Sequence, residues 1–126
     1  MNATLQNALA LAGRVLMSLI FIVAGFNKIG GYEGTQAYME GMGVPGMLLP
    51  LVILTELGGG LLLLIGFKAR LMAFLLAGFS LLSAVIFHSN FGDSMQSIQF
   101  MKNLAIAGGF LYIVAHGPGA WSLDRK

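Results

Sequence analysis

The fold class is decided by the run Pro50-Leu51-Val52-Ile53-Leu54-Thr55-Glu56-Leu57-Gly58-Gly59-Gly60-Leu61-Leu62-Leu63-Leu64-Ile65-Gly66. This run is apolar and long enough to cross a bilayer as a helix, and it holds one carboxylate, Glu56, near its middle. A charged side chain at that depth is costly unless it faces protein or trapped water. We therefore expect Glu56 to point into a helix bundle and to have a basic partner on a neighbouring span.

The composition indicates a membrane protein. Of the 126 residues, 57% are hydrophobic and only 10% are charged, whereas a soluble domain carries about 25% charged residues. The length allows four spans of about 20 residues each. We predict an all-α, four-helix transmembrane bundle that forms a single domain over residues 1–126, with a short amphipathic interfacial helix between spans 1 and 2. The predicted spans are about 5–27, 46–67, 71–88 and 98–116.

The basic residues predict the orientation of the chain. In a multi-pass membrane protein the short cytoplasmic connections carry the excess of Lys and Arg. One side of the predicted bundle holds four basic residues, and the other side holds Lys28. The four are Lys68, Arg70, Arg125 and Lys126. This distribution predicts that both termini are cytoplasmic.

Residue types exclude several kinds of site. The net charge is only +2 and the basic residues do not cluster, so nucleic-acid binding is not expected. The chain has no cysteine, which excludes a disulfide or a thiol redox pair of its own. His88 and His116 are predicted at opposite membrane faces, and therefore no metal site is expected. A redox role would need a bound cofactor or a partner.

Three charges are predicted to meet inside the bundle. With a rise of 1.5 Å per residue, Arg14 lies about 14 Å from the cytoplasmic edge of span 1, and Glu56 about 16 Å from the same edge of span 2. Antiparallel neighbours would place these two side chains level, so we expect them to pair. Lys102 would lie about 5 Å further out and is a second cation without a carboxylate.

Each candidate side chain has a functional and a structural interpretation. Glu56 could bind a ligand or carry a proton, or it could form a structural ion pair with Arg14. Lys102 could bind a ligand or extend to the interface. His88 could donate to a quinone carbonyl or cap a helix end. The candidates for buried polar or ligand-binding positions are Arg14, Glu56, Lys102, His88, Asn103 and Tyr112. Lys28 is predicted to be an interface anchor.

The order of the motifs resembles the DoxX family of small membrane proteins. The resemblance covers nearly the whole chain and rests on Arg14, Gly25-Phe26-Asn27-Lys28, Glu56-Leu57-Gly58-Gly59-Gly60, Gly66-Phe67 with Arg70, Phe87-His88, Lys102-Asn103, and Gly117-Pro118-Gly119 with Ser122-Leu123-Asp124. It implies a four-helix protein of a bacterial inner membrane. The family takes its name from a subunit of a thiosulfate:quinone oxidoreductase, and other members are linked to complexes that handle oxidative or thiol stress.

Two hypotheses about function follow. In the first, the chain is a quinone-binding membrane subunit that supports a partner oxidoreductase. In the second, it is a non-catalytic scaffold or assembly subunit whose buried charges are structural. A transporter has less support, because four short helices show no internal repeat. The sequence leaves open whether the chain is itself an enzyme and whether it forms a homo-oligomer.

Overall fold

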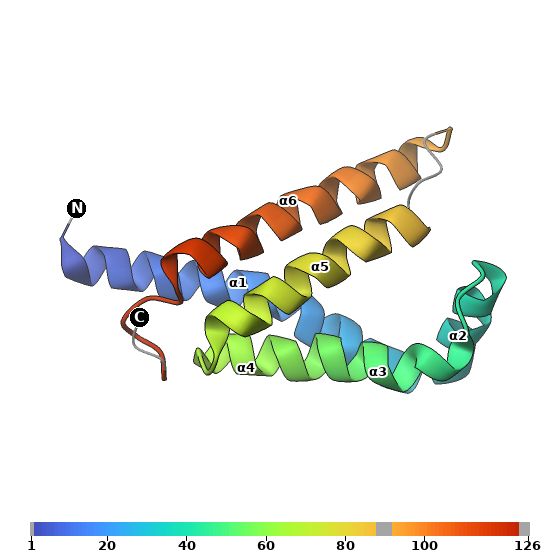
Figure 1. Ribbon diagram of the computed structural model, residues 1–126, viewed down its shortest axis with the longest axis horizontal. Coiled ribbons are helices and arrows are strands. Elements are labelled where there is room, and N and C mark those ends of the chain that lie inside the picture. Colours follow the sequence, from blue (N-terminus) through green and yellow to red (C-terminus); the bar gives the residue numbers. More distant parts are fainter. Residues whose placement is uncertain (1, 88–91, 124–126) are drawn as a thin grey trace.

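The computed structural model describes residues 2–87 and 92–123, and in these ranges its regular structure is entirely helical (Figure 1). Four helical stretches are long and apolar enough to cross a membrane: α1 (Ala3–Gly30), the composite stretch Gly46–Ile65, α5 (Ala69–Phe87) and α6 (Ser94–His116). The all-α prediction with four spans is therefore confirmed. The short helix predicted after span 1 is α2 (Tyr32–Gly41).

The second span consists of four consecutive helical pieces. They are η1 (Gly46–Leu48), α3 (Leu49–Ile53), η2 (Leu54–Gly58) and α4 (Gly59–Ile65). The η2 segment is a π-helical turn with Glu56 at its centre. Such turns are rare and occur frequently at functional sites. Gly66 ends the span at φ 76°, in the left-handed conformation that glycine adopts without strain.

The helices form two antiparallel pairs that diverge toward one end. Figure 1 shows α1 alongside the composite second span, and α5 alongside α6. The core lies where the pairs meet and includes Phe21, Leu63, Leu76 and Phe110. Toward α2, the α5–α6 pair separates from the second span (Figure 1). At the level of η2 and α2, residues of both pairs line a pocket.

Close approach of α1 to the second span depends on a glycine. A Cβ atom added to Gly25 would lie 2.9 Å from the backbone nitrogen of Leu57. We expect Gly25→Ala to lower the free energy of unfolding by about 1–3 kcal/mol, because the backbones must move apart. Gly13→Ala on the same helix is the control, since its added Cβ meets nothing within 4 Å. Detergent-solubilised protein unfolded in a denaturant series would measure both, and equal effects would contradict the close approach.

Candidate functional site

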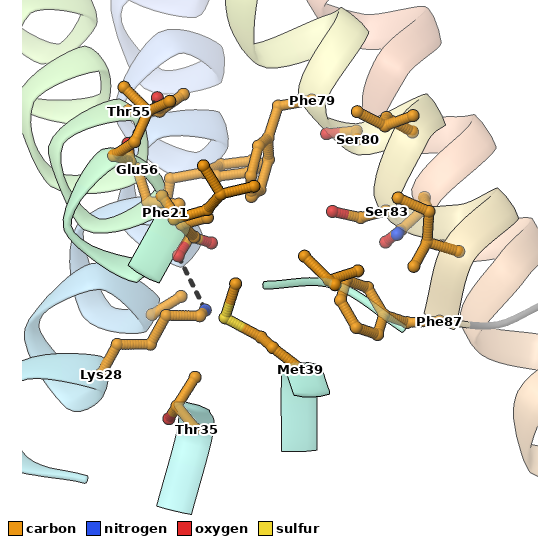
Figure 2. Close-up of a pocket in the computed structure, with 18 of the residues that line it drawn as sticks. Phe21, Lys28, Thr35, Met39, Thr55, Glu56, Phe79, Ser80, Ser83 and Phe87 are labelled. Carbon is orange, nitrogen blue, oxygen red and sulfur yellow. Dashed lines mark hydrogen bonds and ion pairs between the residues drawn. The ribbon is translucent and has the colours of Figure 1, made fainter. Parts of the chain in front are cut away.

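A cavity of about 520 Å³ lies where the helix pairs diverge. Small-molecule sites in proteins are typically about 300–1,000 Å³ and mostly apolar, and this lining is mostly apolar as well. Figure 2 shows α2 closing one end, with Thr35 and Met39 beside the cavity. Tyr38 of α2 stacks on Phe87 of α5, with ring centroids 5.5 Å apart. The cavity is therefore lined by elements far apart in the sequence.

One wall carries an ion pair between α1 and η2. Lys28 Nζ lies 2.7 Å from Glu56 Oε1, and the Glu56 side chain is only 6% exposed (Figure 2). Glu56 is ten residues from the start of the stretch Gly46–Ile65, which places it about 15 Å along that helix and near mid-span. Oε1 receives no well-aligned hydrogen bond from the described residues. The carboxylate thus has a counter-ion but retains hydrogen-bonding capacity.

The facing wall carries hydroxyl groups of α5. Ser80 is 2% exposed, and its Oγ has no hydrogen-bond partner within residues 2–87 and 92–123. A hydroxyl in a helix commonly bonds to the carbonyl four residues earlier, as Ser18 does to Arg14 at 2.7 Å and Thr55 to Leu51 at 2.8 Å. Figure 2 shows the Ser80 hydroxyl directed toward the cavity instead. A buried unpaired polar atom of this kind requires an explanation, such as a ligand or water.

Ser83 and Asn103 add polar groups on the same side. Ser83 belongs to α5 and Asn103 to α6, and both line the cavity. Asn103 was among the candidates predicted from sequence. In the described part of the chain, no three His, Cys, Asp or Glu side chains gather as a metal site would require. The polar groups of the cavity are therefore suited to hydrogen bonding with an organic ligand.

The predicted pairing of Arg14 with Glu56 is wrong, because Lys28 occupies that position. Arg14 is buried, but its guanidinium donates to three backbone carbonyls, one in α4 and two in the segment after α6. The distances are 3.2 Å from Nε to Leu64 O, 2.6 Å from Nη1 to Pro118 O, and 2.9 Å from Nη2 to Trp121 O. Arg14 thus fastens the segment after α6 to α1 and α4.

The predicted pairing of Arg14 with Glu56 was wrong because it assumed an incorrect axial alignment of α1 with the second span. Gly25 lies against Leu57, and Arg14 lies against Leu64. Leu64 is eight residues beyond Glu56, or about 12 Å along a helix. The N-terminal part of α1 projects past the turn between α4 and α5 (Figure 1). Aligning the two spans from their apolar ends therefore placed Arg14 too close to Glu56.

Two predicted interior residues on α6 are instead on its outer face. Lys102 is exposed and does not line the cavity. Tyr112 is 69% exposed, and its ring lies 4.4 Å from that of His116. The predictions that these side chains face the bundle interior are wrong, because α6 packs through Ala107 and Phe110. The remaining candidate, His88, lies outside the described residues.

Two residues of the cavity were missed or misassigned from the sequence. Lys28 was predicted to be an interface anchor, but its side chain turns to the cavity wall and is 27% exposed. Ser80 was not a candidate. A signal for Ser80 was available, because Ser80 and Ser83 interrupt an otherwise apolar run from 71 to 87. Polar residues three apart in such a run lie on one helix face.

Comparison with known proteins shows that the DoxX family model matches residues 9–89 of the chain. The chain belongs to the DoxX family. It is 57% identical over 121 residues to inner membrane protein YqjF of Escherichia coli K12, covering 96% of this chain and 93% of that protein. It is 40% identical over 125 residues to inner membrane protein YphA of the same organism, covering 94% and 89%. The sequence resemblance is thereby confirmed.

A more distant relative is CatD of Bacillus subtilis, whose name assigns it provisionally to the oxidoreductases. It is 34% identical over 73 residues, covering 58% of this chain and 54% of CatD. No solved structure matches the chain significantly. Lys28, Glu56 and Ser80 all fall within the range that the DoxX model matches, whereas Asn103 lies beyond it.

Proposed function

We propose that this DoxX-family chain binds a quinone, or a similar small amphipathic molecule, in the cavity and supports electron transfer by a partner oxidoreductase. The observation that carries the proposal is a mostly apolar cavity with polar groups on facing walls, an ion pair on one and an unpaired buried hydroxyl on the other. A quinone ring is flat and largely apolar, with two carbonyl acceptors. Pockets that combine apolar walls with a few placed polar groups suit such molecules.

The surroundings of the cavity favour a ligand that is dissolved in the bilayer. Leu48, Leu51 and Leu82 line the cavity and are also 41%, 60% and 61% exposed. Side chains that line a cavity and are also exposed show where the cavity reaches the surface, which here is between the second span and α5. Because these are membrane-crossing helices by length and composition, a lipid-soluble molecule would enter without passing through water.

We further propose an inner-membrane location with both termini in the cytoplasm. YqjF and YphA are both named as inner membrane proteins, and this supports an inner-membrane location. The orientation is supported by Lys68, in the turn between α4 and α5, and by Arg70, in the first turn of α5, on the side of the bundle that holds the termini. Basic connections favour the cytoplasmic side. In this orientation α2 and the cavity lie toward the outer face.

We expect purified wild-type protein to retain quinone, detectable by mass spectrometry of an organic extract. Added decylubiquinone should raise the unfolding midpoint, because a ligand at 100 times its dissociation constant contributes about 2.7 kcal/mol. Ser83→Phe fills the cavity and should abolish this shift. Val85→Phe is the matched control, since Val85 lies on the same helix and is 60% exposed. Absence of bound quinone together with no shift in the wild type would refute the proposal.

A non-catalytic scaffold is the second candidate, and Arg14 is the observation that favours it. This buried cation is engaged with three carbonyls of its own chain, so at least one charge inside the bundle has a structural explanation. A scaffold would keep its function when the Lys28–Glu56 pair is replaced by apolar side chains of similar volume. The quinone proposal makes the opposite prediction for that replacement, because the replacement removes the polar groups from one wall of the cavity.

A further inference from the structure

We propose that the cavity takes an uncharged ligand with two hydrogen-bond acceptors, one bound by Lys28 on the α1 wall and the other by Ser80 on the α5 wall. This inference rests on ligand binding in the cavity as proposed above. It adds the charge of the ligand and the two side chains that hold it.

The charge balance of the lining selects an uncharged ligand. Among the described lining residues, the charged ones are Lys28 and Glu56, and they neutralise each other at 2.7 Å. An anion would have to separate this pair or leave an unbalanced charge at membrane depth. Both outcomes are costly, because ions in a low-dielectric site need close partners. A neutral molecule leaves the pair intact.

Hydrogen-bonding capacity identifies the two donors. The Lys28 ammonium has three N–H donors, and its ion pair with Glu56 leaves others for a ligand. The Ser80 hydroxyl is buried and has no partner in the described part of the chain. Figure 2 shows the two groups on opposite sides of the cavity, with the hydroxyl directed inward. A ring with an acceptor at each end would satisfy both at once.

The two donors differ in strength, and this gives a spectroscopic signature. A hydrogen bond from an ammonium group is charge-assisted and roughly twice as strong as one from a hydroxyl. The two carbonyl groups of a bound quinone should therefore be polarised unequally. Infrared difference spectra of carbonyl-labelled decylubiquinone bound in lipid nanodiscs should show two separated carbonyl bands.

Ser80→Ala tests the assignment of the hydroxyl. We expect one carbonyl band to move toward its unbound position and the affinity for decylubiquinone to fall about three- to tenfold, which corresponds to one hydrogen bond. Ser80→Thr keeps a hydroxyl and should restore both the position of the carbonyl band and the affinity for decylubiquinone. The ligand-free protein should not lose stability in Ser80→Ala, because the removed hydroxyl makes no bond there. If the Ser80 hydroxyl had a purely structural role, Ser80→Ala would instead lower the stability of the ligand-free protein and leave the carbonyl bands of the quinone unchanged.

Thiosulfate tests the inferred charge of the ligand. This anion should neither stabilise the wild-type protein nor compete with decylubiquinone, and stabilisation that is lost in Lys28→Met would overturn the inference. The outcomes separate the two proposals. If the wild type binds no quinone, the proposed function fails. If it binds quinone but Ser80→Ala changes neither the bands nor the affinity, only the assignment of the donors fails.

Discussion

Replacing Arg14 by alanine is expected to lower the free energy of unfolding by at least about 3 kcal/mol, since hydrogen bonds to charged groups contribute roughly 1.5–3 kcal/mol each. The guanidinium is 3% exposed and donates to the carbonyls of Leu64, Pro118 and Trp121. Alanine removes these donors and leaves partly or fully buried carbonyls without them. The contributions need not add, because the bonds share one side chain.

The segment after α6 should also detach in this variant. Two of the three carbonyls belong to residues 117–123, and the Leu123 amide donates to Ile65 O at 3.1 Å. Limited proteolysis should therefore cleave this segment faster in Arg14→Ala than in wild type. Arg14→Lys should recover only part of the stability, because an ammonium cannot reproduce the planar fork of a guanidinium.

Arg70→Ala is the matched control for the loss of a cation near the same end of the bundle. Arg70 is exposed, and surface substitutions usually change stability by less than about 0.5 kcal/mol. If Arg14→Ala unfolded at the same denaturant concentration as Arg70→Ala, with equal proteolysis of the tail, the three carbonyl bonds would not fasten the segment as described.

Sequence periodicity located the buried face of α1 well. In the sequence, Arg14, Ser18, Phe21, Gly25 and Lys28 follow one another at steps of three or four, which predicts one inward-facing stripe, and the first four are the buried residues of that helix. Glu56 was predicted to be buried from the cost of a charge in lipid, and it is. Both results follow from local rules, since the helical repeat and the depth of a residue along its own span do not depend on the other helices.

The same reasoning failed where the outcome depends on how helices are placed against one another. Periodicity fixes a face but not the axial alignment of two helices, so the partner of Glu56 was wrong. On α6 the face with Ala107 and Phe110 packs against the bundle, whereas Lys102 lies on an exposed face. The cavity itself arises from divergence of the two helix pairs. The sequence of a single helix does not determine that divergence.

Separating the Lys28–Glu56 pair is the second change with a large expected effect. Removing one partner of a buried ion pair destabilises by about 3–5 kcal/mol, because the remaining charge is left uncompensated. Lys28→Met should destabilise more than Glu56→Leu, since the Glu56 side chain is 6% exposed and that of Lys28 is 27% exposed. A lysine left alone can extend toward the interface. Unfolding in denaturant would rank the two variants, and equal losses would contradict this asymmetry.

The double variant Lys28→Met/Glu56→Leu separates folding from ligand binding. Replacing a buried ion pair by apolar residues of similar volume is often neutral or stabilising, so the double variant should unfold near the wild-type midpoint. The cavity would remain, but its α1 wall would have lost the donor assigned to the ligand. We therefore expect a folded protein in which decylubiquinone no longer raises the unfolding midpoint. Retained binding of quinone would show that Lys28 is not needed to hold the ligand, and it would leave the ion pair with a purely structural role.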